Sequence, residues 1–205
     1  MHTDLKFVQS VPKLRETTRH TILKVARLVF ARRGAENTTM DDVAKASGLG
    51  RRTIYTYFKT REDLYHEVVN NEVEYIIRKL DRVAEMNLSP DKKIVRFMKT
   101  HMKTVQNLVQ RYRVLRTDFL NRNERIESFR LKIDAHEKNC LATILHEGTQ
   151  SGLFIVEDHE NTALLTLTTL KGLERQFIID DFGQPCNDQL ELWHKILLRG
   201  IKASA

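Results

Sequence analysis

Two adjacent arginines followed by a threonine stand at the start of a short helical pattern near residue 50. Arg51, Arg52 and Thr53 have side chains that can reach base edges in the major groove of DNA. An arginine placed there can bond bidentately to guanine O6 and N7, which is worth about 1–3 kcal/mol of discrimination against other bases. The alternative for each arginine is a phosphate contact, which positions a protein without reading sequence. These three residues are therefore candidates for base contacts.

A capped helix and a tight turn precede the arginines. Thr39, followed three residues later by Asp42, predicts a helix start in which the threonine oxygen accepts an otherwise unpaired backbone N–H. Gly48 breaks this helix because glycine tolerates the left-handed backbone angles of a tight turn. A second helix is predicted over residues 51–57, with Ile54 facing inward. Two short helices joined by a glycine turn, the second fronted by arginines, form the pattern of a helix-turn-helix.

Further residues around this pattern fall into two runs with regular offsets. They are Ala26-x-x-x-Phe30-x-x-x-Gly34 with Thr39-x-x-x-Val43-Ala44-x-x-x-Gly48, and Ile54-Tyr55-x-Tyr57-Phe58-x-x-Arg61-Glu62-x-Leu64. Together they resemble the N-terminal domain of the TetR family of bacterial transcriptional regulators. The resemblance covers residues 20–69 of the 205. It is specific, because the capping residues, the glycines and the aromatic residues all fall at the offsets expected for the family.

The resemblance implies an all-α protein with a three-helix DNA-binding head and a larger helical body for ligand binding and dimerisation. It implies that Tyr57, Lys59 and Thr39 contact DNA phosphates. The implied function is a sequence-specific transcriptional regulator: a repressor that binds a palindromic double-stranded DNA operator as a homodimer and is released by a small-molecule effector. No enzymatic activity is expected.

The distribution of charge agrees with a DNA-binding head. The chain has a formal net charge of +7, and residues 1–63 hold 13 Lys and Arg against 7 Asp and Glu. The remaining residues hold 21 against 20, so the positive excess lies almost wholly in the helix-turn-helix region. A local positive patch raises the concentration of a polyanion near the protein and speeds its binding.

Apolar residues at helical spacing predict long helices elsewhere. These are expected over residues 15–33, 60–86, from 90 onward, 124–149, 158–182 and 187–202. We divide the chain into a flexible arm (1–14), a DNA-binding domain (15–69) and an effector-binding and dimerisation domain (70–205). The last two helices are the predicted dimer interface, as halves of a four-helix bundle. The alternative is that they only complete the core of the monomer.

The resemblance places an effector pocket among the helices of residues 90–182. Methionine, aromatic, histidine and cysteine side chains at helical spacing are the candidates to line it, although such a stripe is also what an ordinary core contains. This mixture favours an apolar or amphipathic effector over a sugar phosphate. The candidates are Phe97, His101, Met102, Phe119, Phe129, His136, Cys140 and Phe177.

Other chemistry finds little support in the sequence. His136-x-x-x-Cys140 puts two possible metal ligands on one helical face, but zinc needs three or four and no second cluster converges in sequence, so we expect no metal site. No catalytic residue and no cofactor are predicted. No apolar run is long enough for a membrane helix and no secretory signal is recognisable, so Cys140 and Cys186 should be reduced thiols in a cytoplasmic protein.

Two other functions remain compatible with a basic helix-turn-helix. A non-specific architectural protein would bind unrelated duplexes with similar affinity. A helical interaction module would keep the shape without binding DNA, and replacing both Arg51 and Arg52 by alanine would then leave its function intact.

Overall fold

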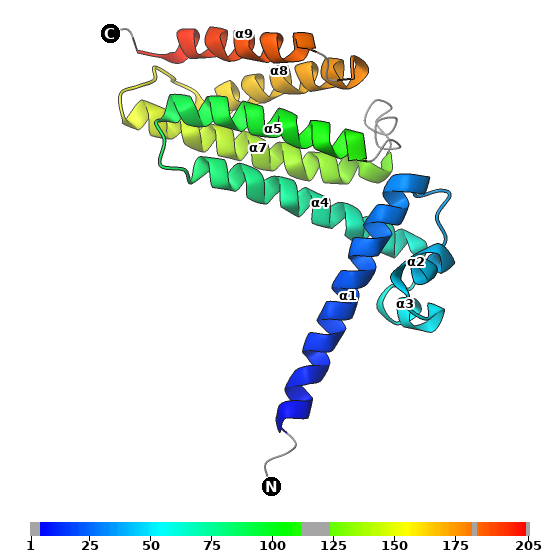
Figure 1. Ribbon diagram of the computed structural model, residues 1–205. Coiled ribbons are helices and arrows are strands. Elements are labelled where there is room, and N and C mark those ends of the chain that lie inside the picture. Colours follow the sequence, from blue (N-terminus) through cyan, green and yellow to red (C-terminus); the bar gives the residue numbers. More distant parts are fainter. Residues whose placement is uncertain (1–4, 112–123, 182–183, 204–205) are drawn as a thin grey trace. The chain divides into compact units, whose positions relative to one another are not determined.

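The computed structural model describes the backbone of residues 5–111, 124–181 and 184–203 (Figure 1). Regular structure in these ranges is helical, apart from one antiparallel bridge between Phe154 and Lys202. The predicted all-α fold is confirmed. The chain divides into two compact units, which among the described residues comprise those up to Glu72 and those from Val73 onward.

Three helices and the start of a fourth build the first unit. They are α1 (Leu5–Arg33), α2 (Met40–Ser47), α3 (Arg51–Tyr57) and α4 (Arg61–Ala84), which continues into the second unit. Apolar side chains from all four form one buried core: Ile22, Leu23, Ala26, Phe30, Met40, Val43, Ala44, Ile54, Phe58, Leu64 and Val68. The ring of Phe30 meets that of Tyr65 edge-on at 5.4 Å between centroids, so α1 packs against the first turns of α4. The helix-turn-helix thus rests on a shared hydrophobic core.

The start of α1 differs from the prediction. The sequence suggested a helix from residue 15, because Pro12 and weak apolar periodicity argued against regular structure before it. The helix begins at Leu5 instead, so Pro12 lies inside it and the predicted start is wrong. Proline holds φ near the helical value but removes one backbone donor, so the helix continues through Pro12 with one hydrogen bond fewer. Contact of the predicted arm, residues 1–14, with DNA stays a prediction.

The second unit consists of the remaining helices with the C-terminal part of α4. These are α5 (Pro90–Arg111), α7 (Glu124–Gln150), α8 (His159–Ile179) and α9 (Gln184–Ile201). In Figure 1, α5 and α7 run side by side and α8 and α9 lie along them, and the contacts between these helices agree. Fully buried side chains include Leu80, Ile94, Phe97, Met98, Leu141, Ile144, Leu145, Leu170 and Phe177.

Most of these helices begin and end close to their predicted limits. The start of α9 is earlier, at Gln184 rather than at 187. Pro185 had suggested a break, but proline suits the first turn of a helix, where the backbone N–H has no helical partner in any case.

Near the end of α7, the backbone at Gly148 lies very close to the ring of Phe154. A methyl group added at Gly148 would lie 1.9 Å from Cδ2 of the buried Phe154 ring, so only glycine fits there without movement. The backbone after this turn pairs with the end of α9: Ile155 N–H donates to the Ile201 carbonyl at 2.7 Å, and Ala203 N–H donates to Leu153 at 3.1 Å. The short apolar link of residues 153–155 therefore attaches the C-terminal helix to the rest of the unit.

Candidate nucleic-acid interface

The first helix of the motif is capped as the sequence predicted. Asp42 N–H donates to Thr39 Oγ1 at 3.1 Å, and Thr39 N–H donates to Asp42 Oδ2 at 2.9 Å. The backbone hydrogen bond from Thr39, its hydroxyl and the nearby Arg33 guanidinium lower the pKa of Asp42 to about 2. Asp42 is therefore ionised at neutral pH, where its charge suits the positive end of the helix.

The turn between the two helices depends on a left-handed residue. Gly48 has φ of 68°, and its N–H bonds back to carbonyls of the last turn of α2. An added methyl group would meet nothing within 4 Å, so the requirement for glycine comes from the backbone angle and not from crowding. Gly50 is the N-cap of α3, and its carbonyl accepts from Thr53 N–H at 2.9 Å.

The second helix has one buried and one exposed side. Ile54 is completely buried, as predicted, and Phe58, directly after the helix, is buried as well. Arg51 and Arg52 are exposed on the other side. The rest of the predicted DNA-contacting set is also accessible on the first unit: Thr39 and Lys59 are exposed, and Thr53 and Tyr57 are half-buried. All six residues can reach a ligand, and their contacts with DNA stay predictions.

The two arginines of α3 differ in their surroundings. Arg51 Nε lies 3.1 Å from Asp41 Oδ1 and Arg51 Nη1 lies 3.2 Å from Asp41 Oδ2. Its guanidinium also lies over the Tyr55 ring, 5.6 Å from the centroid. Within the described part of the chain, the Arg52 side chain forms no ion pair. Sequence reasoning missed the role of Asp41, although an acidic residue in the first turn of α2 was a visible signal.

The second unit contains a buried charge cluster made of His101, Glu137, Lys171 and Glu174. His101 Nδ1 lies 2.6 Å from Glu137 Oε1, and His101 Nε2 lies 2.9 Å from Glu174 Oε2. Lys171 Nζ lies 3.0 Å from Glu137 Oε2 and 3.4 Å from Glu174 Oε2. Burial opposes the charge on His101, but the Glu137 carboxylate and the hydrogen bonds that the ring donates to both glutamates outweigh it and raise the pKa of His101 to about 9. Both ring nitrogens are thus engaged, so a ligand could bond to this ring only by displacing a glutamate.

The predicted pocket residues lie in several places. Met102 and Phe177 line a cavity of about 530 Å³ between α5, α8 and α9. Phe97 is completely buried in the core and His101 belongs to the charge cluster. Phe129 is half-buried on α7. Phe119 lies outside the described residues.

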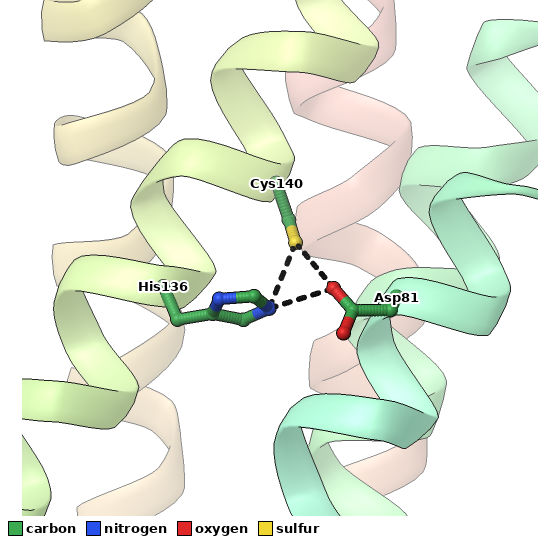
Figure 2. Close-up of side chains that lie close together, drawn as sticks. All are labelled: Asp81, His136 and Cys140. Atoms are coloured by element: carbon green, nitrogen blue, oxygen red, sulfur yellow. Dashed lines mark hydrogen bonds and ion pairs between the residues drawn. The ribbon is translucent and has the colours of Figure 1, made fainter. Parts of the chain in front are cut away.

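His136 and Cys140 gather around a third polar side chain. Asp81, on α4, points toward both of them from across the interhelical space (Figure 2). A third potential ligand therefore comes from another helix, and the expectation of no metal site stays a prediction. Asp81 is 55 residues from His136 in sequence, so no local spacing could have revealed it.

A capped helix, a left-handed glycine and an arginine-fronted second helix on a common core define a helix-turn-helix DNA-binding protein. Residues 22–68 match the family model described as bacterial regulatory proteins, tetR family. The regulator YfiR of Bacillus subtilis is 41% identical over 64 residues, 31% of this chain and 31% of YfiR. The regulator YhgD of the same organism is 29% identical over 158 residues, 71% of this chain and 76% of YhgD.

The whole fold is similar to a solved regulator as well. FadR from Bacillus subtilis, solved in complex with stearoyl-CoA, superposes with a TM-score of 0.67 at 21% identity, covering 89% of this chain and 98% of FadR. Residues 22–68 therefore carry the DNA-binding domain of bacterial regulatory proteins of the tetR family, and the described chain has the all-helical fold of the solved regulators. Within the described residues, no helix combines the length and the apolar character needed to cross a membrane.

Proposed function

We propose that this protein is a repressor that binds a palindromic DNA operator as a homodimer and is released by a small molecule. The observation that carries the proposal is the exposed pair Arg51 and Arg52 at the start of α3, above the buried Ile54. In this geometry the N-terminal turn of α3 enters the major groove, where Arg51, Arg52 and Thr53 meet base edges. Thr39, Tyr57 and Lys59 then contact phosphates on either side.

Dimerisation supplies the second helix-turn-helix, which reads the other half-site of the operator. The faces of α8 and α9 that point away from the core of the unit carry large apolar side chains: Leu165 is 68% exposed, Leu192 59% and Ile196 54%. Gly172 on α8 and Gly200 on α9 have open space where a side chain would be. Glycine costs a helix about 1 kcal/mol relative to alanine, so its presence there is better explained by close approach of a second subunit. We infer a four-helix bundle of α8 and α9 from two copies.

The effector is proposed to be amphipathic. The cavity that contains Met102 and Phe177 also has Leu190 on its apolar side and Lys99, Lys103 and Glu191 at its charged rim. A cavity that combines buried apolar side chains with exposed charged ones suits a molecule that has an apolar body and a polar end. Stearoyl-CoA, which is bound in the FadR structure, is a molecule of this class.

Release requires that the two functions share an element. In our assignment, residues 15–69 bind DNA and residues 70–205 bind effector and dimerise, and α4 belongs to both because it runs from Arg61 to Ala84. A ligand that prefers one arrangement of the second unit shifts the population toward it, and α4 transmits the change. Because such coupling is reciprocal, operator DNA must weaken effector binding by the factor by which effector weakens operator binding. We place this activity in the cytoplasm, where the operator lies.

A genome-fragment selection with the purified protein tests the proposal. We expect enrichment of an inverted repeat whose half-sites lie about 34–36 Å apart, or a multiple of that distance. The variant with both Arg51→Ala and Arg52→Ala, refolded and checked by circular dichroism, should enrich nothing. Enrichment without a common sequence would favour the architectural alternative, and unchanged regulation by the double variant in cells would favour the interaction module.

A further inference from the structure

Three side chains from two helices of the second unit present a nitrogen, a sulfur and an oxygen to one point (Figure 2). His136 Nε2 lies 3.5 Å from Cys140 Sγ and 2.8 Å from Asp81 Oδ1, and Cys140 Sγ lies 3.8 Å from the same oxygen. His136 and Cys140 are one helical turn apart on α7, and Asp81 reaches them from α4. The arrangement therefore joins two helices that are distant in sequence.

These separations resemble those around a tetrahedral zinc ion. Zinc binds sulfur at about 2.3 Å, imidazole nitrogen at about 2.0–2.1 Å and carboxylate oxygen at about 2.0–2.2 Å, so tetrahedral angles place its ligand atoms about 3.3–3.6 Å from one another. The sulfur–nitrogen distance of 3.5 Å already fits, and the sulfur–oxygen distance of 3.8 Å is close. The nitrogen–oxygen distance of 2.8 Å is that of a hydrogen bond and has to widen by about 0.5 Å. Asp81, whose side chain is 40% exposed, is free enough to make that movement.

The chemistry of the donors selects the kind of ion. Nitrogen, thiolate sulfur and one carboxylate suit zinc and similar transition metals, whereas magnesium and calcium prefer oxygen ligands throughout. An Asp81 carboxylate, a Cys140 thiolate and a neutral imidazole together balance the charge of a divalent ion. The partial exposure of His136 and Asp81 gives an ion a route from solvent, while Cys140 lies deeper.

The geometry points to a Zn²⁺ site formed by Asp81, His136 and Cys140, with a fourth position open to water. On binding, the Cys140 sulfur donates a lone pair to the ion and its proton leaves to solvent. The imidazole carries its proton on Nδ1, so that Nε2 is free to coordinate. The bound ion joins α4 to α7.

The metal-free state explains why these groups lie together without an ion. Without an ion, the Cys140 thiol donates to Asp81 Oδ1 at 3.8 Å and His136 Nε2 lies 2.8 Å from the same oxygen, so hydrogen bonds hold the three groups together. The same carboxylate that opposes a thiolate becomes favourable once a divalent cation lies between them, because a coordinated thiol is deprotonated outright. Binding should therefore release a measurable proton.

Titration of the full-length, reduced and chelator-treated protein tests the site. We expect one equivalent of Zn²⁺ in competition with a chromophoric chelator, and with Co²⁺ a near-ultraviolet sulfur-to-cobalt band together with intense visible bands of a tetrahedral ion. Cys140→Ser, His136→Gln and Asp81→Asn should each weaken Zn²⁺ binding at least tenfold, and Cys140→Ser should remove the sulfur band.

Matched controls separate this site from adventitious binding. Cys186→Ser removes the other cysteine and should leave both the affinity and the cobalt spectrum unchanged. His146 and His159, whose ring centroids are 5.1 Å apart, form another possible metal-binding pair. The double variant His146→Gln, His159→Gln should likewise bind zinc normally. Undiminished zinc binding by a folded Cys140→Ser variant, or a cobalt complex without a sulfur band, would overturn the proposal.

Discussion

The guanidinium of Arg51 forms an ion pair with the carboxylate of Asp41, in which Nη1 donates a hydrogen bond to Oδ2 at 3.2 Å and Nε lies 3.1 Å from Oδ1. This pair joins the start of α3 to the first turn of α2. The carboxylate occupies a guanidinium N–H that could otherwise donate to guanine O6 or N7. Asp41 therefore orients Arg51 in the free protein and competes with the base that Arg51 is proposed to read.

Asp41→Ala should lower sequence discrimination. It removes a negative charge beside the phosphates and leaves Arg51 free to bond to phosphate oxygens, so affinity for unrelated duplexes should rise. The ratio of operator to non-operator affinity should fall several-fold, measured by fluorescence anisotropy at one fixed salt concentration. Glu62→Ala, which removes an exposed acid that pairs with Arg61 instead, is the control. An unchanged ratio for Asp41→Ala would show that the pair has no part in recognition.

Salt dependence should report the phosphate contacts. Neutralising roughly 6 phosphates per dimer predicts that log K falls with log salt at a slope of about −5, and Lys59→Ala, which removes two of them, should reduce it to about −3.5. Lys92→Ala changes an exposed lysine of the second unit and should leave the slope unchanged. A flat response of the unmodified protein would contradict the electrostatic part of the proposal.

A charge on the exposed face of α8 should separate the subunits. Leu165 is 68% exposed in a single chain, so Leu165→Glu costs the monomer little but would place a carboxylate in the proposed bundle. We expect sedimentation equilibrium at micromolar concentration to show a dimer for the unmodified protein and a folded monomer for the variant. Leu28→Glu alters an apolar residue of α1 that is 51% exposed and should remain dimeric. An unmodified protein that sediments as a single subunit would contradict the proposed homodimer.

Gly148→Ala should destabilise the second unit. The new methyl group would lie 1.9 Å from the Phe154 ring, and overpacking of this kind typically costs about 1–3 kcal/mol. Urea unfolding followed by circular dichroism measures the loss. Combining Gly148→Ala with Phe154→Leu should cost less than the sum of the two single changes, because the smaller side chain makes room. Strict additivity would mean that the methyl group is accommodated elsewhere.

The buried charge cluster should make stability depend on pH. The pKa of His101 is raised from 6.5 to about 9 in the folded protein. Its contribution to the free energy of unfolding is therefore complete below pH 6.5 and is lost as pH rises through 9. Burial opposes the charge of Glu174, but Lys171 and His101 lower its pKa from 4.5 to about 2, so that contribution is present above pH 4.5 and is lost as pH falls through 2. The free energy of unfolding in urea should therefore be smaller at pH 9.5 than at pH 6.5.

A variant without the imidazole identifies the group responsible. His101→Gln leaves two buried carboxylates with one cationic partner fewer, and breaking a buried ion pair typically costs about 3–5 kcal/mol. The difference in stability between pH 6.5 and pH 9.5 should also shrink in this variant. A variant that keeps the full difference would assign the alkaline loss to another group.

Helix types and local turns were predictable because their signals lie close together in sequence. The cap joins Thr39 to Asp42, three residues apart, and the turn at Gly48 needs a single left-handed residue. The buried position of Ile54 followed from helical periodicity. The start of α1 at Leu5 was not predictable in this way, because Pro12 and the weak apolar periodicity around it carry no local helix signal.

The side-chain clusters needed the tertiary structure. Periodicity indicates which face of a helix is buried, but it does not determine how far two packed helices slide or rotate against each other. That register brings Asp81 to His136 across 55 residues, and His101 to Glu137 and Glu174 across 36 and 73. The sequence by itself determined an all-helical regulator with a DNA-reading helix at residues 51–57, since hydrogen bonds and caps within a few residues encode it. Only the packing of the helices decided which polar side chains meet inside the second unit, because those contacts depend on geometry between segments that share no local signal.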